Sequence, residues 1–186
     1  MLEVNDDLNK GLFKNSPFKY KGEKYYYMDG NIVDSSFITP SDSLVTEITN
    51  LLYKLFDYKL YPTAVVLQYI KETKKHNSYN LAITAIEYLL NERNDSVNYV
   101  RIVLPILTSI YRECGKSQAA IEQGEKFLSL SYKYKSAALL TSLAAAYCDI
   151  ENYIKAKQLA NEAWAISGFS PELSSVFQRI KANTEK

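Results

Sequence analysis

A group of basic residues offers the chain its clearest chemistry, which is the binding of anions. Lys71, Lys74 and Lys75 lie within the stretch KETKKH, and Arg112 follows further along the chain. Ammonium groups act as point charges for carboxylates and phosphates. The sequence therefore favours a basic binding surface. The plain alternative is that KETKK is only the solvated end of a helix.

Catalytic chemistry finds less support in the sequence. The single histidine, His76, follows three lysines at the polar end of a predicted helix, where we expect it to be ordinary surface. Cys114 and Cys148 fall on predicted helices and are expected to be structural. The motifs of nucleotide-binding loops, zinc proteases, redox dithiols and serine hydrolases are absent from the sequence. We therefore expect a protein that is not an enzyme and that holds no cofactor or metal.

The composition is that of a globular protein without a strong electric field. The 186 residues are 47% hydrophobic and 23% charged, and the net charge is +1. Such a balance does not draw in nucleic acid or an anionic membrane over long distances. The stretch MLEVNDDLNK is acidic and lacks the apolar core of a signal peptide, and no apolar run is long enough to span a bilayer. A cytoplasmic protein with no membrane contact is the expectation.

The first 41 residues differ in character from the rest. Residues 1–16 show no clear period and predict a short helical arm or a tail. In residues 17–39, three tyrosines precede Asp29-Gly30, a dipeptide that favours a tight hairpin turn between strands. We expect a small meander of two or three strands. Tyr25, Tyr26 and Tyr27 are predicted either to cover the end of a helical domain or to bind a partner.

From residue 42 onward the sequence predicts helices almost without interruption. Apolar residues recur at helical spacing, and residues that favour helix starts separate the segments. Pro105 lies inside the fourth helix and is expected to bend it. The predicted helices begin near residues 42, 62, 78, 96, 117, 136, 152 and 170. The sequence thus divides into an arm and meander over 1–41 and a helical domain over 42–186.

The helical domain contains an internal repeat. Leu140-x-x-Leu143-Ala144-x-x-Tyr147 has a counterpart 36 residues earlier, in Leu104-x-x-Leu107-Thr108-x-x-Tyr111. In both copies an alanine follows nine residues after the tyrosine. A weaker unit around Ala82 lies 38 residues before the copy at Ala120. An irregular helical bundle in which the pattern recurs by chance is the alternative explanation.

These residues, over about 62–184, resemble the tetratricopeptide repeat, whose first helix carries W-x2-L-G-x2-Y and whose second carries A-x3-F. Leucine replaces the tryptophan, and Ala144 and Thr108 replace the glycine. The resemblance implies an all-α fold of stacked antiparallel helical hairpins in a right-handed superhelix, here with a small N-terminal β-hairpin or meander. The last helix would be a capping helix. Residues 1–40 show no resemblance.

The resemblance also implies a concave groove that is lined by the first helix of each pair. The groove-facing positions would be Leu67, Lys71, Lys74, Lys75, Ile102, Pro105, Ser109, Arg112, Glu113, Thr141, Ala145, Cys148 and Asp149. This arrangement predicts a basic end and a smooth floor that includes Ser109, suited to an acidic or C-terminal peptide segment. The expected function is a protein-interaction module or adaptor, as a homodimer or as a subunit of a larger complex.

Nucleic acid is the alternative partner. Lysines alternate with aromatic residues in the predicted meander and could form a stacking platform, together with the KETKKH run. The residues concerned are Phe18, Lys19, Tyr20, Lys21, Lys24, Tyr25, Tyr26 and Tyr27. The near-zero net charge and the acids Glu23, Asp29 and Asp34 in the same segment disfavour this reading.

Overall fold

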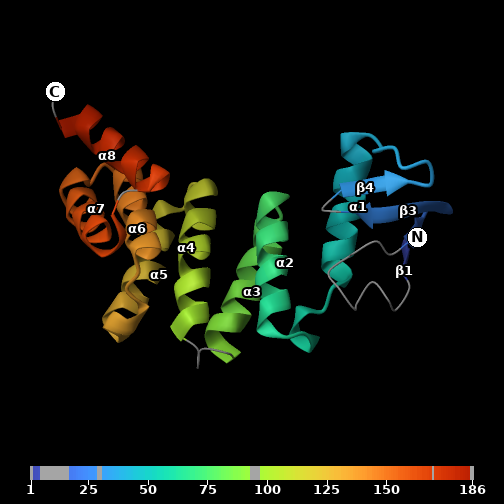
Figure 1. The fold of residues 1–186 in the computed structure, drawn as a ribbon, viewed down its shortest axis with the longest axis horizontal. Coiled ribbons are helices and arrows are strands. Elements are labelled where there is room, and N and C mark those ends of the chain that lie inside the picture. The colour runs from blue at the N-terminus through green and yellow to red at the C-terminus, as the bar shows by residue number, and fades with distance from the viewer. Residues whose placement is uncertain (1, 5–16, 29–30, 93–96, 169, 185–186) are drawn as a thin grey trace. The chain divides into compact units, whose positions relative to one another are not determined.

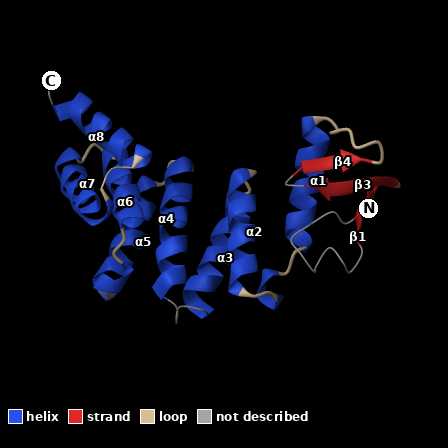
Figure 2. Cartoon of the chain, in the orientation of Figure 1, coloured by secondary structure: helices blue, strands red, loops and turns tan. Residues whose placement is uncertain are grey.

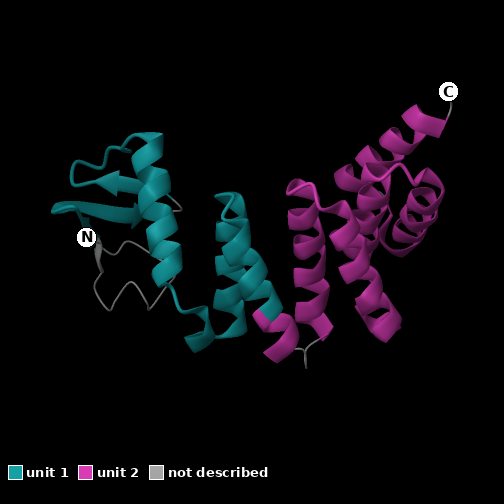
Figure 3. Ribbon diagram, turned by 180° about the vertical axis from the view of Figure 1, so that it is seen from behind, with its two compact units in different colours: residues 1–87 teal, residues 88–186 magenta. Residues whose placement is uncertain are grey.

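The computed structural model describes residues 2–4, 17–28, 31–92, 97–168 and 170–184, and these residues are mostly helical (Figures 1 and 2). They form eight α-helices, two short 3-10 helices and one small antiparallel sheet. The contacts divide the chain into a first unit, residues 1–87, and a second unit, residues 88–186 (Figure 3). The expected boundary at 41/42 differs from this division, because the sheet packs on the first helix and belongs to the same unit.

The sheet is a four-stranded antiparallel meander in the order β1-β2-β3-β4. Its strands are β1 (Leu2–Val4), β2 (Pro17–Tyr20), β3 (Glu23–Met28) and β4 (Asn31–Asp34). The turn between β2 and β3 has φ of 50° at Lys21 and 88° at Gly22, as a type I′ turn requires. The Asp29-Gly30 turn lies outside the described residues. The expectation of a helical arm or tail was wrong for residues 2–4, which pair with β2.

The inner face of the sheet packs on helix α1 (Asp42–Leu55), which begins where Pro40-Ser41-Asp42 predicted. The tyrosine hydroxyls of Tyr27 and Tyr53 lie 3.4 Å apart at this contact, and Tyr20 donates a hydrogen bond to Glu47. The buried residues of the sheet are Phe18, Tyr20, Tyr25, Tyr27 and Ile32. Alternation of buried and exposed side chains along the strands leaves the other face of the sheet to solvent.

The rest of the first unit is a helical hairpin with an aromatic core. A 3-10 helix, η2 (Tyr58–Leu60), leads into α2 (Thr63–Lys75), and α3 (Tyr79–Glu92) crosses the division between the units. The Tyr69 hydroxyl donates a 3.0 Å hydrogen bond to the carbonyl of Tyr53. Burial raises the pKa of Tyr69 to about 12, so this donor stays protonated.

The second unit consists of two further helical hairpins and a last helix. These are α4 (Val97–Glu113), α5 (Ser117–Leu130), η3 (Tyr132–Tyr134), α6 (Ala137–Asp149), α7 (Tyr153–Ser167) and α8 (Pro171–Thr184). Fully buried alanines, including Ala144, Ala156 and Ala160, let the helices approach closely. At Gly124 a Cβ atom would lie 2.5 Å from Cδ2 of Leu143, so glycine permits the contact between α5 and α6.

The repeat is visible in the turn that ends the first helix of each hairpin. The backbone N–H of Lys116 donates to the carbonyl of Tyr111, and that of Asn152 donates to Tyr147, 36 residues later. Ser78 donates to Thr73 in the same way, 38 residues before Lys116. The residue before each donor has a positive φ, at Asn77, Gly115 and Glu151. The same left-handed C-cap thus closes all three helices.

Candidate functional site

A hollow of about 450 Å³ lies on the face formed by α4, α6 and α8 in the second unit. We call it the arginine hollow, because Arg112 and Arg179 both line it. The other lining residues are mostly small or hydroxylated: Ser109, Thr141, Ser142, Ala145, Pro171, Glu172, Ser175 and Val176. Its three helices are labelled in Figure 1. A concave surface with a few polar groups is typical of a binding site.

The two arginines of the hollow converge on one carboxylate, that of Asp149 at the end of α6. Arg112 Nε donates a 2.7 Å hydrogen bond to Oδ2, and Arg179 Nη2 donates a 2.6 Å bond to Oδ1. The hydroxyl of Ser117, at the start of α5, donates a 2.9 Å bond to Oδ2. One aspartate therefore ties α4, α5 and α8 to the end of α6.

The electrostatics of this cluster favour a charged, ion-paired Asp149. Burial raises the pKa of its carboxyl, but the hydrogen bonds from Arg112 and Arg179 outweigh burial and bring the pKa below its ordinary value. Two guanidinium charges and one carboxylate leave a local charge of +1. The Asp149 side chain is only 25% exposed, so solvent screens the cluster incompletely.

The structure brings together several of the positions expected to face a groove. Ser109, Arg112, Thr141 and Ala145 all line the arginine hollow, and Asp149 binds one of its arginines. The contribution of α8 was missed, because that helix was interpreted only as a cap. Residues 34 positions after Thr141 and Ala145 are Ser175 and Arg179, so one more step of the repeat would have found them.

The three lysines expected at the basic end lie elsewhere. Lys71, Lys74 and Lys75 are on α2, in the first unit, and they do not line the arginine hollow. Lys71 and Lys75 are exposed, and Lys74 is half-buried. The structure thus unites Ser109 and Arg112 with α8 and leaves the lysines as a separate group.

The three consecutive tyrosines divide between the two faces of the sheet. Tyr25 and Tyr27 are buried on the inner face, where they form part of the core. Tyr26 is half-buried on the outer face, and its ring stacks on Phe37 with 5.6 Å between the ring centroids. Only the middle tyrosine therefore faces a potential partner.

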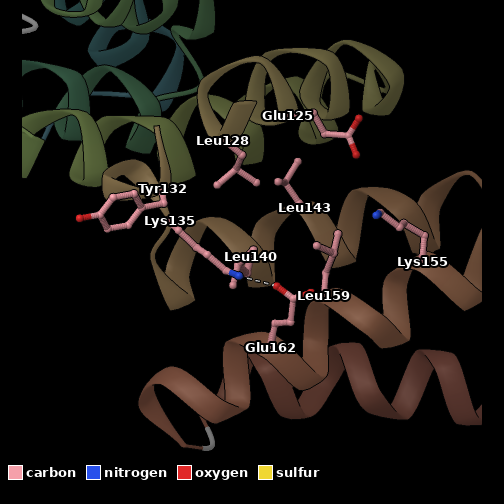
Figure 4. A pocket seen from close by; sticks show the side chains of 9 residues that line it. All are labelled: Glu125, Leu128, Tyr132, Lys135, Leu140, Leu143, Lys155, Leu159 and Glu162. Carbon is pink, nitrogen blue, oxygen red and sulfur yellow. Dashed lines mark ion pairs between the residues drawn. The ribbon is translucent and has the colours of Figure 1, made fainter. Parts of the chain in front are cut away.

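A second hollow, of about 440 Å³, lies between α5, η3, α6 and α7 (Figure 4). We call it the leucine hollow, because Leu128, Leu140, Leu143 and Leu159 line it. Charged side chains surround these leucines, and Lys135 pairs with Glu162 at 2.7 Å across the site, as the dashed line in Figure 4 shows. The leucines are themselves largely buried, so an occupant would find little free apolar surface.

His76 is not the ordinary surface residue that its sequence context predicted. Its ring lies 5.9 Å from that of Tyr53, and its Nε2 atom is buried without a hydrogen-bond partner. Oε2 of Glu72, one turn earlier on α2, is also buried and unpaired. Burial lowers the pKa of His76, which keeps the imidazole neutral. Packing of α2 against α1 covers a side chain that the local sequence presents as polar.

Within the part of the chain that the structure describes, no group of three or more His, Cys, Asp or Glu side chains is arranged to hold a metal ion. Nor does any described helix have the length and apolar character needed to cross a membrane. Comparison with protein-family models, with curated proteins and with solved structures finds no match to this chain. The argument for function therefore depends on the geometry of the sites.

Proposed function

We propose that this chain is a tetratricopeptide-like interaction module or adaptor, which binds an acidic or C-terminal peptide segment of a partner protein in the arginine hollow. The observation that carries the proposal is the convergence of Arg112 and Arg179 on one carboxylate. Guanidinium groups held in this arrangement fit a carboxylate ligand. A peptide carboxylate would add to the cluster or displace Asp149 from it.

The lining of the hollow suits an extended segment. Ala145 is small, and the hydroxyls of Thr141, Ser142 and Ser175 offer donors and acceptors to a peptide backbone. Glu172 lies at the start of α8 and adds a negative charge to the rim. The proposed ligand therefore places its carboxylate at the arginines and a neutral or basic residue near Glu172.

A binding role fits the protonation states better than catalysis does. Proton transfer at neutral pH needs a group whose pKa lies near 7. The hydrogen bonds to Asp149 instead move the pKa of its carboxyl further from neutrality. This carboxylate is suited to hold arginines in place, and we propose that the module has no catalytic activity.

The test uses synthetic peptide pools of about six residues, offered with either a free or an amidated C-terminus and with or without Asp and Glu. Binding to the full chain is measured by fluorescence polarisation. We expect the pools with free carboxylates to bind, and Arg179→Gln to weaken that binding by about tenfold. Asp149→Asn should strengthen it, because the internal competitor for the arginines loses its charge.

The matched control is Lys126→Gln, which removes an exposed positive charge from α5, outside the arginine hollow. This variant should bind the peptides as the wild type does. Equal binding of free and amidated pools would contradict the proposal, as would a uniform loss of affinity in Lys126→Gln and Arg179→Gln. The opposite signs expected for Arg179→Gln and Asp149→Asn separate carboxylate recognition from general loss of structure.

A further inference from the structure

The outer face of the sheet in the first unit presents basic and aromatic side chains to solvent. Lys19 on β2 and Lys24 on β3 are exposed, and Tyr26 on β3 is half-buried. Phe37 follows β4 and stacks on Tyr26, with an angle of 24° between the two ring planes. We call these four residues the basic-aromatic face. They come from two strands and a loop that the sheet brings together.

The two lysines of this face stand opposite each other in neighbouring strands. The pairing of β2 with β3 places Lys19 directly across from Lys24. Like charges in such a pair repel, because their Cβ atoms lie only about 5 Å apart. Glu3 of β1 stands across from Lys19 in the register, but neither lysine has an ion-pair partner among the described residues. An anion would relieve this repulsion.

Lys21 shows by contrast what a satisfied lysine looks like in the same sheet. Its Nζ atom lies 3.5 Å from Oε1 of Glu47 on α1. Hydrogen bonding to Tyr20 and the charge of Glu47 raise the pKa of Lys21. The ammonium group of Lys24 instead lies 5.1 Å from the centroid of the Tyr26 ring, so it is held beside the aromatic part of the face.

Phe37 is held in place by a tightly bonded loop, although its side chain is exposed. Its φ is 60°, a left-handed conformation that is rare for a bulky residue. Oδ1 of Asp34 accepts hydrogen bonds from the backbone N–H groups of Ser36 and Ile38, at 2.8 and 3.0 Å. The backbone N–H of Asp34 donates to the carbonyl of Ile38 at 2.9 Å. The loop thus fixes an aromatic ring that is 64% exposed.

From this arrangement we infer that the basic-aromatic face binds single-stranded nucleic acid. A base stacks on the exposed ring of Phe37, which Tyr26 supports from behind, and the phosphates flanking that base pair with Lys19 and Lys24. Aromatic stacking combined with backbone charge is how proteins bind single strands without reading their sequence. The low net charge of the chain does not oppose this site, because the two lysines are local and unpaired.

Nucleic acid fits this face better than an apolar protein surface does. A protein that covered Phe37 would also cover the neighbouring Lys19 and Lys24, and buried ammonium groups without partners are costly. A nucleotide supplies both complements at once, because it carries a planar base next to a phosphate. Any base can stack on the ring, so the face would not select a particular sequence.

The experiment measures fluorescence anisotropy of a labelled oligonucleotide of about ten thymidines, with the full chain at two salt concentrations. With two phosphates neutralised, log Kd should change by about 1.4 per decade of salt, so binding weakens about sevenfold between about 50 and about 200 mM. Changing both Lys19→Gln and Lys24→Gln should remove most of this salt dependence. The exposed-lysine control Lys126→Gln should leave it unchanged.

The role of stacking is tested at Phe37, where the side chain is exposed and substitution should not disturb the core. Phe37→Ala and Phe37→Leu should each weaken binding about tenfold, whereas Phe37→Tyr keeps the ring and should bind as the wild type does. An abasic strand, which keeps the phosphates but lacks the bases, should bind about tenfold more weakly than the thymidine strand. Circular dichroism of each variant confirms that the sheet is intact.

Three results would overturn the inference. The first is the absence of oligonucleotide binding by the wild-type chain at the lower salt concentration. The second is binding that the two lysine substitutions leave unaltered, since the site would then lie elsewhere. The third is equal binding of abasic and thymidine strands, or full activity of Phe37→Leu, because either shows that no base stacks on the ring.

Discussion

The aspartate shared by two arginines offers the most informative single change in this chain. Replacing Asp149 by asparagine keeps the size and shape of the side chain but removes its charge. Arg112 and Arg179 then face each other's charge with only a neutral amide between them. Since these residues come from α4, α6 and α8, the change should weaken the second unit as a whole.

The size of the effect follows from the geometry and exposure of the cluster. Hydrogen bonds to a buried charge contribute about 1.5–3 kcal/mol each, whereas fully exposed ion pairs contribute about 0.2–1 kcal/mol. The exposed fractions of the Arg112, Asp149 and Arg179 side chains are 24%, 25% and 39%, between those limits. We expect Asp149→Asn to lower the free energy of unfolding by about 1–2 kcal/mol.

The loss should depend on pH with a definite sign. The pKa of Asp149 is lower in the folded state than its ordinary value of 3.8. The carboxylate therefore stabilises the folded protein fully at pH values well above 3.8, and this stabilisation disappears as the pH falls through the folded pKa. The difference between wild type and variant should be constant near neutrality and should vanish in acid.

Urea unfolding, followed by circular dichroism at several pH values, measures this difference. A double-mutant cycle that combines Asp149→Asn with Arg112→Gln or Arg179→Gln separates the two pairs. The control is Glu122→Gln, which removes an exposed carboxylate that accepts a hydrogen bond only from Gln118 among the described contacts. If Asp149→Asn unfolds at the wild-type urea concentration, or if its effect persists in strong acid, the electrostatic account of the cluster is wrong.

Three further predictions concern the packing of the two units. Gly124→Ala should lower the free energy of unfolding by about 1 kcal/mol in urea titration, because displacing Leu143 costs more than alanine's better helix propensity returns. Tyr69→Phe should cost about 1 kcal/mol in the same assay, since it removes the buried hydrogen bond to Tyr53. Burial lowers the pKa of His76, so the unfolded chain binds a proton more readily, and stability should decline slightly as the pH falls through about 6.5; His76→Gln should flatten this decline in urea midpoints measured at about pH 7.5 and about pH 5.5.

The helical part of the fold could be predicted from the sequence because its signals are local. Asn152 was expected to begin a helix, and its side chain accepts a hydrogen bond from the backbone N–H of Lys155. Ser136 caps α6 in the same way, through the N–H of Leu139. Pro105 was correctly placed inside a helix, and α4 continues through it. Periodicity and caps determine such elements without help from distant residues.

The features that were missed depend on partners far away in sequence. Residues 2–4 become a strand only because β2 lies beside them, and their own sequence is too short to show a period. His76 is covered because Tyr53 of another helix lies against it. Phe37 drew no attention, because a single aromatic after a strand reveals neither its exposure nor its stacking on Tyr26. Sites assembled from several elements were therefore predicted only where the repeat supplied the register.

The uneven distribution of aromatic residues makes the two units optically distinct. The only tryptophan of the chain, Trp164, lies on α7 and is 50% exposed, whereas tyrosines such as Tyr53 and Tyr69 fill the core of the first unit. Emission excited at the red edge of the indole band therefore reports on residues 88–186 alone. Near-ultraviolet dichroism of buried tyrosines weights the other unit. Recording both during one unfolding transition shows whether the two halves melt together or in sequence, with no label added to the chain.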